Sequence, residues 1–262
     1  MGSNSTTTSR RQGTPHGRRE PSSAAGREAS PGLSIEWLGL RPYGEALALQ
    51  REAVADRIAG RTPDRLLLLE HPPVVTLGRS TDRANLKLGI EALRGRGIEL
   101  YEVGRGGDVT YHAPGQLVGY PIVDLDRLGR RDVHEHLRSL EQGLIDALEE
   151  LGLGSRRIPG WTGVFVDRAR SLGRRGGPER KIASIGVGLR RWVTFHGFAL
   201  NVSLDLSGFE SIVPCGLSEV EMTSVSAELA EGSGAPGEMS SKDLDVRVRE
   251  VVGRRVAARL SG

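Results

Sequence analysis

Thiols and side-chain amines are scarce in this chain of 262 residues, which leaves few candidates for chemistry that needs either group. Cys215 is the only cysteine, and it stands between Pro214 and Gly216, a setting that favours a sharp turn at a strand end. A lone cysteine is more often a small buried hydrophobe than a nucleophile. Nucleophilic use of Cys215 requires a neighbour that stabilises the thiolate, because a free thiol has a pKa of about 8.5.

Lysine is almost as scarce, since Lys87, Lys181 and Lys242 are the only three. Lys181 opens a strand-like stretch that continues through several small residues. An amine at the start of such a strand can reach a pocket, whereas a solvated lysine is the ordinary alternative. The residues alone leave both interpretations open for Lys181, as they do for Cys215.

A glycine-rich stretch, Gly104-Arg105-Gly106-Gly107, is a second candidate site. It is not a P-loop, because no Gly-Lys-Ser/Thr follows, and it is not a dinucleotide fingerprint, because a strand rather than a helix comes next. Two interpretations remain open. One is a tight turn or bulge that glycine alone permits. The other is bare backbone that a ligand approaches closely, with Arg105 reaching an anionic or carbonyl group.

Three histidines, His71, His112 and His196, stand beside strand-like segments, where a hydrogen-bonded core histidine is the commoner case. His112 lies between a strand and a turn, so we expect it to face a pocket. His134 and His136 cannot chelate one ion, since residues two apart on a helix point about 200° away from each other. A cysteine-rich zinc site is excluded by the single cysteine, and we expect no metal.

The charge distribution argues against a nucleic-acid partner. The net charge is +3 and the pI is about 9.3, but five arginines and two glutamates within residues 1–33 account for that excess. The remaining residues carry 31 basic and 31 acidic side chains, and aromatic residues make up only 4% of the chain. We expect residues 1–33 to form a disordered basic tail, because this segment has almost nothing to bury. No apolar run is long enough for a membrane span or a secretory signal, so we expect no membrane partner and a cytoplasmic location.

The elements that must position the candidate residues alternate between short strands and amphipathic helices. Strands are expected at 34–40, 66–69, 74–77, 98–103, 108–112, 117–123, 164–166, 181–189, 192–195 and 198–204. Helices are expected at 43–59, 90–94, 241–260 and in a segment capped by Asp132 that ends before Gly152. The turn after His112 predicts a hairpin of 108–112 with 117–123, and loops are expected at 168–180 and 231–237. This order favours one α+β domain, residues 34–262, with a mixed sheet flanked by helices.

Five short motifs stand in one order along this domain: Glu70-His-Pro-Pro73, Arg105-Gly-Gly-Asp-Val-Thr-Tyr-His112 followed by Ala-Pro-Gly-Gln116, Lys181-Ile-Ala-Ser-Ile-Gly186, His196-Gly-Phe-Ala-Leu-Asn-Val202 and Val213-Pro-Cys-Gly216. Together they resemble the signatures of the lipoyl(octanoyl) transferases, and the match runs from about residue 34 to residue 227. Five motifs in register are far more specific than any one of them. The resemblance implies the fold of the biotin and lipoate protein ligases.

The resemblance also implies roles for individual residues. Cys215 would be the acyl-accepting nucleophile and Lys181 its acid/base partner. The acyl and pantetheine pocket would be lined by Arg105, Gly106, Gly107, Asp108, Val109, Thr110, Tyr111, His112, Ser184, Ile185, Gly186, Gly197, Phe198 and Ala199. The backbone amides of Gly106, Gly107 and Gly216 are the candidates for stabilising the oxyanion.

The activity implied is an acyltransferase reaction in protein lipoylation. An octanoyl group would move from octanoyl-acyl carrier protein, through a thioester on Cys215, to a lysine of a lipoyl domain in a 2-oxoacid dehydrogenase complex or in the glycine cleavage H protein. A thioester donor carries its own activation, so no ATP and no cofactor is implied. Two half-reactions on one thiol predict ping-pong kinetics.

Two rival functions remain, and one segment departs from the family pattern. An ATP-dependent lipoate–protein ligase shares the fold but needs no catalytic cysteine, and a non-catalytic member would only bind acyl groups or regulate transcription. The stretch 168–180 makes the connection before Lys181 longer than the family leads us to expect. It is either an inert loop or a basic contact for acidic acyl carrier protein.

Overall fold

The computed structural model of the protein describes residues 1–2, 33–167, 177–213, 220–233 and 240–261. Almost all of the expected tail and the segment that holds Cys215 lie outside these ranges. The chain divides into two units, Met1–Ser30 and Pro31–Gly262, and every helix and strand described belongs to the second.

The larger sheet of this unit has strands in the order β1, β2, β6, β10, β9, β8 and β7, with β11 added beside β9. The strands are β1 (Ser34–Leu40), β2 (Arg65–Glu70), β6 (Gln116–Ile122), β7 (Ser155–Arg156), β8 (Val164–Val166), β9 (Glu179–Arg190), β10 (Val193–Asn201) and β11 (Val220–Met222). The pairs β1–β2 and β9–β11 are parallel, and the other pairs are antiparallel. The sheet is therefore mixed, as expected from the sequence.

A smaller sheet has the order β4 (Glu99–Glu102), β3 (Val74–Leu77) and β5 (Val109–His112). Short helices accompany it: the 3-10 helices η1 (Arg83–Asn85) and η2 (Leu206–Ser211), and the α-helix α2 (Ile90–Gly95). Residues of β3, β5, α2 and η2 share one hydrophobic cluster, so this sheet has a core of its own.

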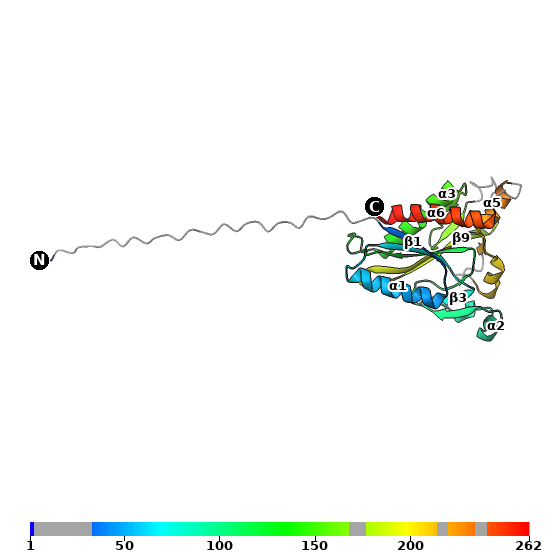
Figure 1. Cartoon of the computed structure of the whole chain (residues 1–262), viewed down its shortest axis with the longest axis horizontal. Coiled ribbons are helices and arrows are strands. Elements are labelled where there is room, and N and C mark those ends of the chain that lie inside the picture. The colour runs from blue at the N-terminus through cyan, green and yellow to red at the C-terminus, as the bar shows by residue number, and fades with distance from the viewer. Residues whose placement is uncertain (3–32, 168–176, 214–219, 234–239, 262) are drawn as a thin grey trace. The chain divides into compact units, whose positions relative to one another are not determined.

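Helices cover both faces of the larger sheet (Figure 1). Helix α1 (Tyr43–Ile58) packs on one face, and α3 (Val133–Glu150) and α6 (Ser241–Ser261) pack on the other, while α5 (Val225–Ser233) follows β11. Strand β2 shows why its sequence is apolar throughout. Leu66 and Leu68 join the cluster with α3 and α6, whereas Leu67 and Leu69 join the cluster with α1.

The strongest helix expected from the sequence is confirmed. The side chain of Asp132 accepts hydrogen bonds from the backbone N–H groups of His134 and Glu135 and so caps α3. In the part of the chain described here, no helix combines the length and the apolar character needed to cross a bilayer.

The expected hairpin of 108–112 with 117–123 is wrong. Strand β5 pairs with β3 in the smaller sheet, while β6 pairs with β2 and β10 in the larger one. The turn between them is held by distant groups. The Gly115 N–H donates to the Glu70 carboxylate at 2.9 Å, and the Gly115 carbonyl accepts from the backbone of Leu204 at 3.1 Å. Glycine and proline correctly predict a turn, but these long-range bonds decide which sheet each strand joins.

Other boundaries also differ from expectation. The strands expected at 192–195 and 198–204 are one strand, β10, that runs through His196 despite its φ of 55°. The expected loop 168–180 loses its last two residues to β9, where Arg180 pairs with Glu221, and residues 168–176 lie outside the description. The expected loop 231–237 loses residues 231–233 to α5. For β9 and β10, hydrogen bonds to neighbouring strands decide the ends.

Candidate active site

A cavity of about 220 Å³ is lined by residues of β5 in the smaller sheet and of β6, β9 and β10 in the larger sheet. Its walls come from elements that are far apart in the sequence. They are Tyr43, Arg105, Gly107, Asp108, Thr110, His112, Val118, Tyr120, Gly160, Trp161, Thr162, Lys181, Ser184, Ile185, Gly186, His196, Gly197, Phe198 and Ala199. Twelve of the fifteen residues named from the sequence for the pocket and for Lys181 are therefore brought together here.

The other three pocket residues lie elsewhere, which corrects part of the expected lining. Val109 and Tyr111 are buried in the core of the smaller sheet, because successive residues of β5 face opposite sides. Gly106 lines a neighbouring cavity of about 230 Å³ that shares Gly107, Thr162, Ile185 and Gly186 with the first. The Gly106 N–H donates to the Val187 carbonyl at 2.8 Å, so this amide is engaged and does not serve an oxyanion.

Lys181, the one lysine within the five motifs, is buried, with 2% of its surface exposed. Its Nζ donates a hydrogen bond to the Thr162 carbonyl at 3.0 Å. The same atom lies 5.6 Å from the centroid of the Phe165 ring. The side chain thus runs along the cavity wall with its amine held at a defined place, and the solvated alternative for Lys181 is wrong.

Arg105 is 8% exposed and belongs to both the cavity wall and the structure beneath it. Its Nη2 donates to the Thr76 carbonyl at 2.7 Å and to the Thr76 hydroxyl at 2.9 Å, and its Nη1 donates to the Gly106 carbonyl at 3.1 Å. These bonds hold the glycine-rich loop against β3. The guanidinium places a fixed positive charge beside the cavity.

Neutral polar rings form one end of the cavity. His112 donates from Nδ1 to the Gln116 side-chain oxygen at 2.7 Å, and its ring lies 5.7 Å from that of His71. His71 in turn contacts the Tyr120 hydroxyl at 2.7 Å through Nε2 and the Arg41 carbonyl at 2.7 Å through Nδ1. His112 faces the cavity as expected, and His71 supports it from behind.

Burial keeps these rings uncharged at neutral pH. Burial lowers the pKa of His71 to about 4, and burial with the nearby arginine charges lowers the pKa of His196 to about 3. Burial likewise lowers the pKa of His112 well below its usual value. Burial raises the pKa of Tyr43 to about 12, although the charge of Arg105 opposes that change. Tyr43, His112 and His196 therefore present uncharged surface at this end of the cavity, which suits a neutral acyl chain or thioester.

Cys215 lies outside the described residues, but the chain on both sides of it is anchored at the cavity. Before it, the Val213 N–H donates to the Asn85 carbonyl at 2.7 Å, and the Asn85 side chain donates to Asp108 at 2.5 Å. After it, Met222 pairs with Lys181 in the β11–β9 ladder. Asp108 and Lys181 both line the cavity, so each flank of the Cys215 segment is attached to its wall.

Sequence reasoning missed several residues of this site. Tyr43, Tyr120 and Trp161 carry no local signal, since only the packing of α1, β6 and the link before β8 brings them to the cavity. Glu141 did carry a signal. It is a carboxylate between Leu137 and Leu144 on the apolar side of α3, and it is fully buried. A charged residue on the buried face of a helix indicates a partner that the spacing alone does not name.

His134 and His136 behave as their spacing predicts. His134 is exposed and His136 is buried on α3. Among the residues described, no group of three or more histidine, cysteine or acidic side chains is arranged to hold a metal ion.

Comparison with known proteins agrees with this picture. A family model described as the lipoyl protein ligase A/B catalytic domain matches residues 42–245. An octanoyltransferase of Solibacter usitatus is 53% identical over 193 residues, which cover 74% of this chain and 82% of that protein. An octanoyltransferase of Geobacter metallireducens is 48% identical over 222 residues, covering 85% of this chain and 91% of that protein.

Solved structures share the fold at much lower identity. A bipartite lipoate protein ligase of Thermoplasma acidophilum gives a TM-score of 0.62 at 20% identity and covers 87% of this chain and 84% of its own. A lipoate–protein ligase A bound with ATP gives 0.61 at 18% identity and covers 88% of this chain and 86% of its own. These two likenesses establish the architecture alone.

Proposed function

This chain belongs to the lipoyl protein ligase A/B catalytic family and is an octanoyltransferase of protein lipoylation, and we propose that it carries the octanoyl group as a thioester on Cys215. The observation that carries the proposal is the burial of Lys181 in the cavity wall, next to the strand that follows the Cys215 segment. A lipoyl domain is the acceptor, and an acyl thioester is the donor.

The first half-reaction moves the acyl group onto the enzyme. The Cys215 thiolate, stabilised by the Lys181 ammonium, attacks the thioester carbonyl carbon of the donor. The new carbon–sulfur bond forms as the donor's carbon–sulfur bond breaks, and the departing thiolate takes the proton of the Lys181 ammonium. Of the two glycine amides of the loop that were candidates for the oxyanion, Gly107 remains, because it lines the cavity and the amide of Gly106 is engaged.

The second half-reaction forms an amide. Acylation removes the negative charge beside Lys181, so this side chain can release its proton and act as a base. It takes a proton from the attacking lysine amine of the lipoyl domain, and the Cys215 thiolate leaves. One thioester and one amine are consumed, and one amide and one thiol are produced.

The finer assignments extend this proposal. Octanoyl-acyl carrier protein is the donor, and the lipoyl domains of 2-oxoacid dehydrogenase complexes and the glycine cleavage H protein are the acceptors. The location is the cytoplasm, where the single cysteine stays reduced. Arg105, Ser184, Ile185, Gly186, Phe198 and Ala199 contact the acyl or pantetheine part of the donor.

The test is octanoyl transfer from octanoyl-acyl carrier protein to a lipoyl domain in the absence of ATP. We expect transfer by the wild type, none by Cys215→Ala and a loss of at least about 100-fold in Lys181→Ala. Lys242→Ala is the matched control, because Lys242 is exposed on α6, and it should transfer like the wild type. Transfer that requires ATP and survives Cys215→Ala would instead identify an ATP-dependent ligase.

A further inference from the structure

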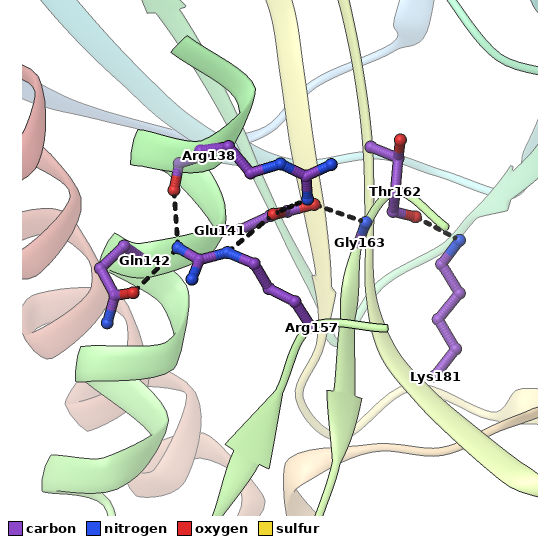
Figure 2. A network of polar contacts seen from close by, with 7 residues as sticks. All are labelled: Arg138, Glu141, Gln142, Arg157, Thr162, Gly163 and Lys181. Carbon is purple, nitrogen blue, oxygen red and sulfur yellow. Dashed lines mark hydrogen bonds and ion pairs between the residues drawn. The ribbon is translucent and has the colours of Figure 1, made fainter. Parts of the chain in front are cut away.

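Glu141 is a buried charge whose place in the structure needs a reason. It is fully buried on α3, between the apolar residues that pack against the larger sheet. Its carboxylate accepts from Arg138 Nη1 at 2.5 Å, from Arg157 Nε at 2.9 Å and from the Gly163 N–H at 3.1 Å (Figure 2). A buried carboxylate is costly unless it is fully paired, and apolar residues in its place are often as stable.

The third of these bonds connects Glu141 to Lys181 through one peptide group. The N–H of Gly163 and the carbonyl of Thr162 belong to the same peptide, which is planar and trans. The N–H donates to Glu141, and the carbonyl, at the opposite side of that plane, accepts from Lys181 Nζ at 3.0 Å. Figure 2 shows Glu141, Gly163, Thr162 and Lys181 in this sequence. Fixing the N–H therefore fixes the direction of the carbonyl that holds the amine.

The carboxylate also acts on the strength of that bond. A negative charge on the N–H side polarises the peptide, so its carbonyl oxygen becomes a stronger acceptor for the Lys181 ammonium. Arg157 keeps Glu141 in place, since its Nη2 donates to the Arg138 carbonyl at 2.9 Å and to the Gln142 side chain at 2.8 Å. The carboxylate, the peptide and the amine thus form one connected unit.

Close packing makes this arrangement rigid. The backbone at Gly163 has a φ of +127°, and a Cβ there would lie 2.8 Å from Lys181 Cε and 2.6 Å from the Ala183 carbonyl. The peptide therefore lies directly against the side chain that it holds. A small rotation of the peptide would displace both the carbonyl and the stem of Lys181.

We propose that Glu141 is a positioning residue for Lys181 in acyl transfer, and that it acts through the Thr162–Gly163 peptide. The role rests on the proposed function of Lys181. Glu141 does not touch the substrate, and its effect reaches the reaction only through the amine.

The test is a double-mutant cycle that combines Glu141→Leu with Lys181→Ala. We expect Glu141→Leu alone to lower kcat for octanoyl transfer by about 10- to 100-fold with little change in KM for the donor. In the Lys181→Ala background the same substitution should change the rate less than about twofold, because the amine that Glu141 positions is already absent. Equal losses in both backgrounds would show that Glu141 acts through folding or through another group, and would overturn the proposal.

A second readout uses the single cysteine. Iodoacetamide can alkylate one thiol in this chain, so the alkylation rate reports Cys215 directly. We expect Glu141→Leu to slow alkylation in the wild-type background and to have no further effect beside Lys181→Ala. Glu141→Gln keeps an oxygen for the Gly163 N–H and should fall between wild type and Glu141→Leu. Glu141→Gln also tests the proposal if Glu141→Leu does not fold.

The control is Asp64→Asn, which removes a carboxylate paired with a buried arginine away from the cavity. Asp64 accepts from Arg57 Nε, and Arg57 is 4% exposed. We expect this variant to lose stability but to keep wild-type transfer and alkylation rates. If wild-type protein itself forms no octanoyl adduct, the proposed function fails. A normal adduct with wild-type kinetics in both Glu141 variants overturns only the role of Glu141.

Discussion

Single residues at this site have little freedom to move. Lys181 is held by a backbone carbonyl and an aromatic face, and Arg105 is held by Thr76. The histidines and tyrosines at the far end of the cavity are kept neutral by burial. Lys181, whose amine reaches the cavity wall, therefore shares the cavity with rings that stay uncharged near neutral pH.

Gly163 is the residue at which this packing can be tested most simply. In Gly163→Ala, the new methyl group would meet Lys181 and the Ala183 carbonyl, so we expect at least a tenfold loss of transfer together with lower stability. Gly152→Ala is the matched control, because Gly152 also has a positive φ, of 84°, but has nothing within 4 Å. It should lose about 1–2 kcal/mol of stability and no activity. Transfer assays and urea unfolding of both variants separate loss of activity from loss of stability, and equal activity in the two would show that Gly163 does not position Lys181.

At the scale of elements, the sequence predicts periodic segments well and long-range pairing poorly. Helix α3 follows from its leucine spacing and the Asp132 cap, and β2 follows from its apolar run. The destination of β5 does not follow, because it depends on Glu70 and Leu204 bonding to Gly115 across the fold. Motif residues near Lys181 could be named from sequence, whereas the walls supplied by Tyr43 and Trp161 depend on packing that no local pattern encodes.

Strand β11 is the element that connects the Cys215 segment to β9, and a buried ion cluster holds it there. The fully buried Glu228 accepts from the Thr223 hydroxyl at 2.5 Å and pairs with Arg180 at 3.1 Å. We expect Glu228→Gln to cost about 1–3 kcal/mol and to slow octanoyl transfer several-fold, because β11 loses its attachment beside Lys181. Glu231→Gln is the control, since its carboxylate is 25% exposed on the same arginine, and should cost less than about 1 kcal/mol. Denaturant unfolding and transfer rates test this. Unchanged stability and transfer rate in Glu228→Gln would show that this ion cluster does not hold β11.

Across the whole molecule, the buried histidines make stability depend on pH. Burial lowers the pKa of His71 and His136 to about 4 and that of His196 to about 3, while the unfolded value is 6.5. Between pH 6.5 and 4 the unfolded chain therefore binds protons that the folded chain does not, so stability falls as the pH falls. Each such histidine contributes up to about 1.4 kcal/mol per pH unit in this range.

The measurement is the urea midpoint at pH 7 and at pH 5. We expect a clearly lower midpoint at pH 5, and we expect His136→Leu, which changes a residue of α3 outside the cavity, to reduce the difference. An equal urea midpoint at the two pH values would show that these rings bind protons in the folded protein as readily as in the unfolded chain.

Intact mass spectrometry of the wild-type protein mixed with octanoyl-acyl carrier protein shows whether Cys215 carries the octanoyl group as a thioester. We expect one octanoyl group to be added to the wild type, none to Cys215→Ala, and the added group to be transferred to a lipoyl domain supplied without ATP. A wild-type protein that stays unmodified while the lipoyl domain becomes octanoylated would contradict the proposed thioester on Cys215.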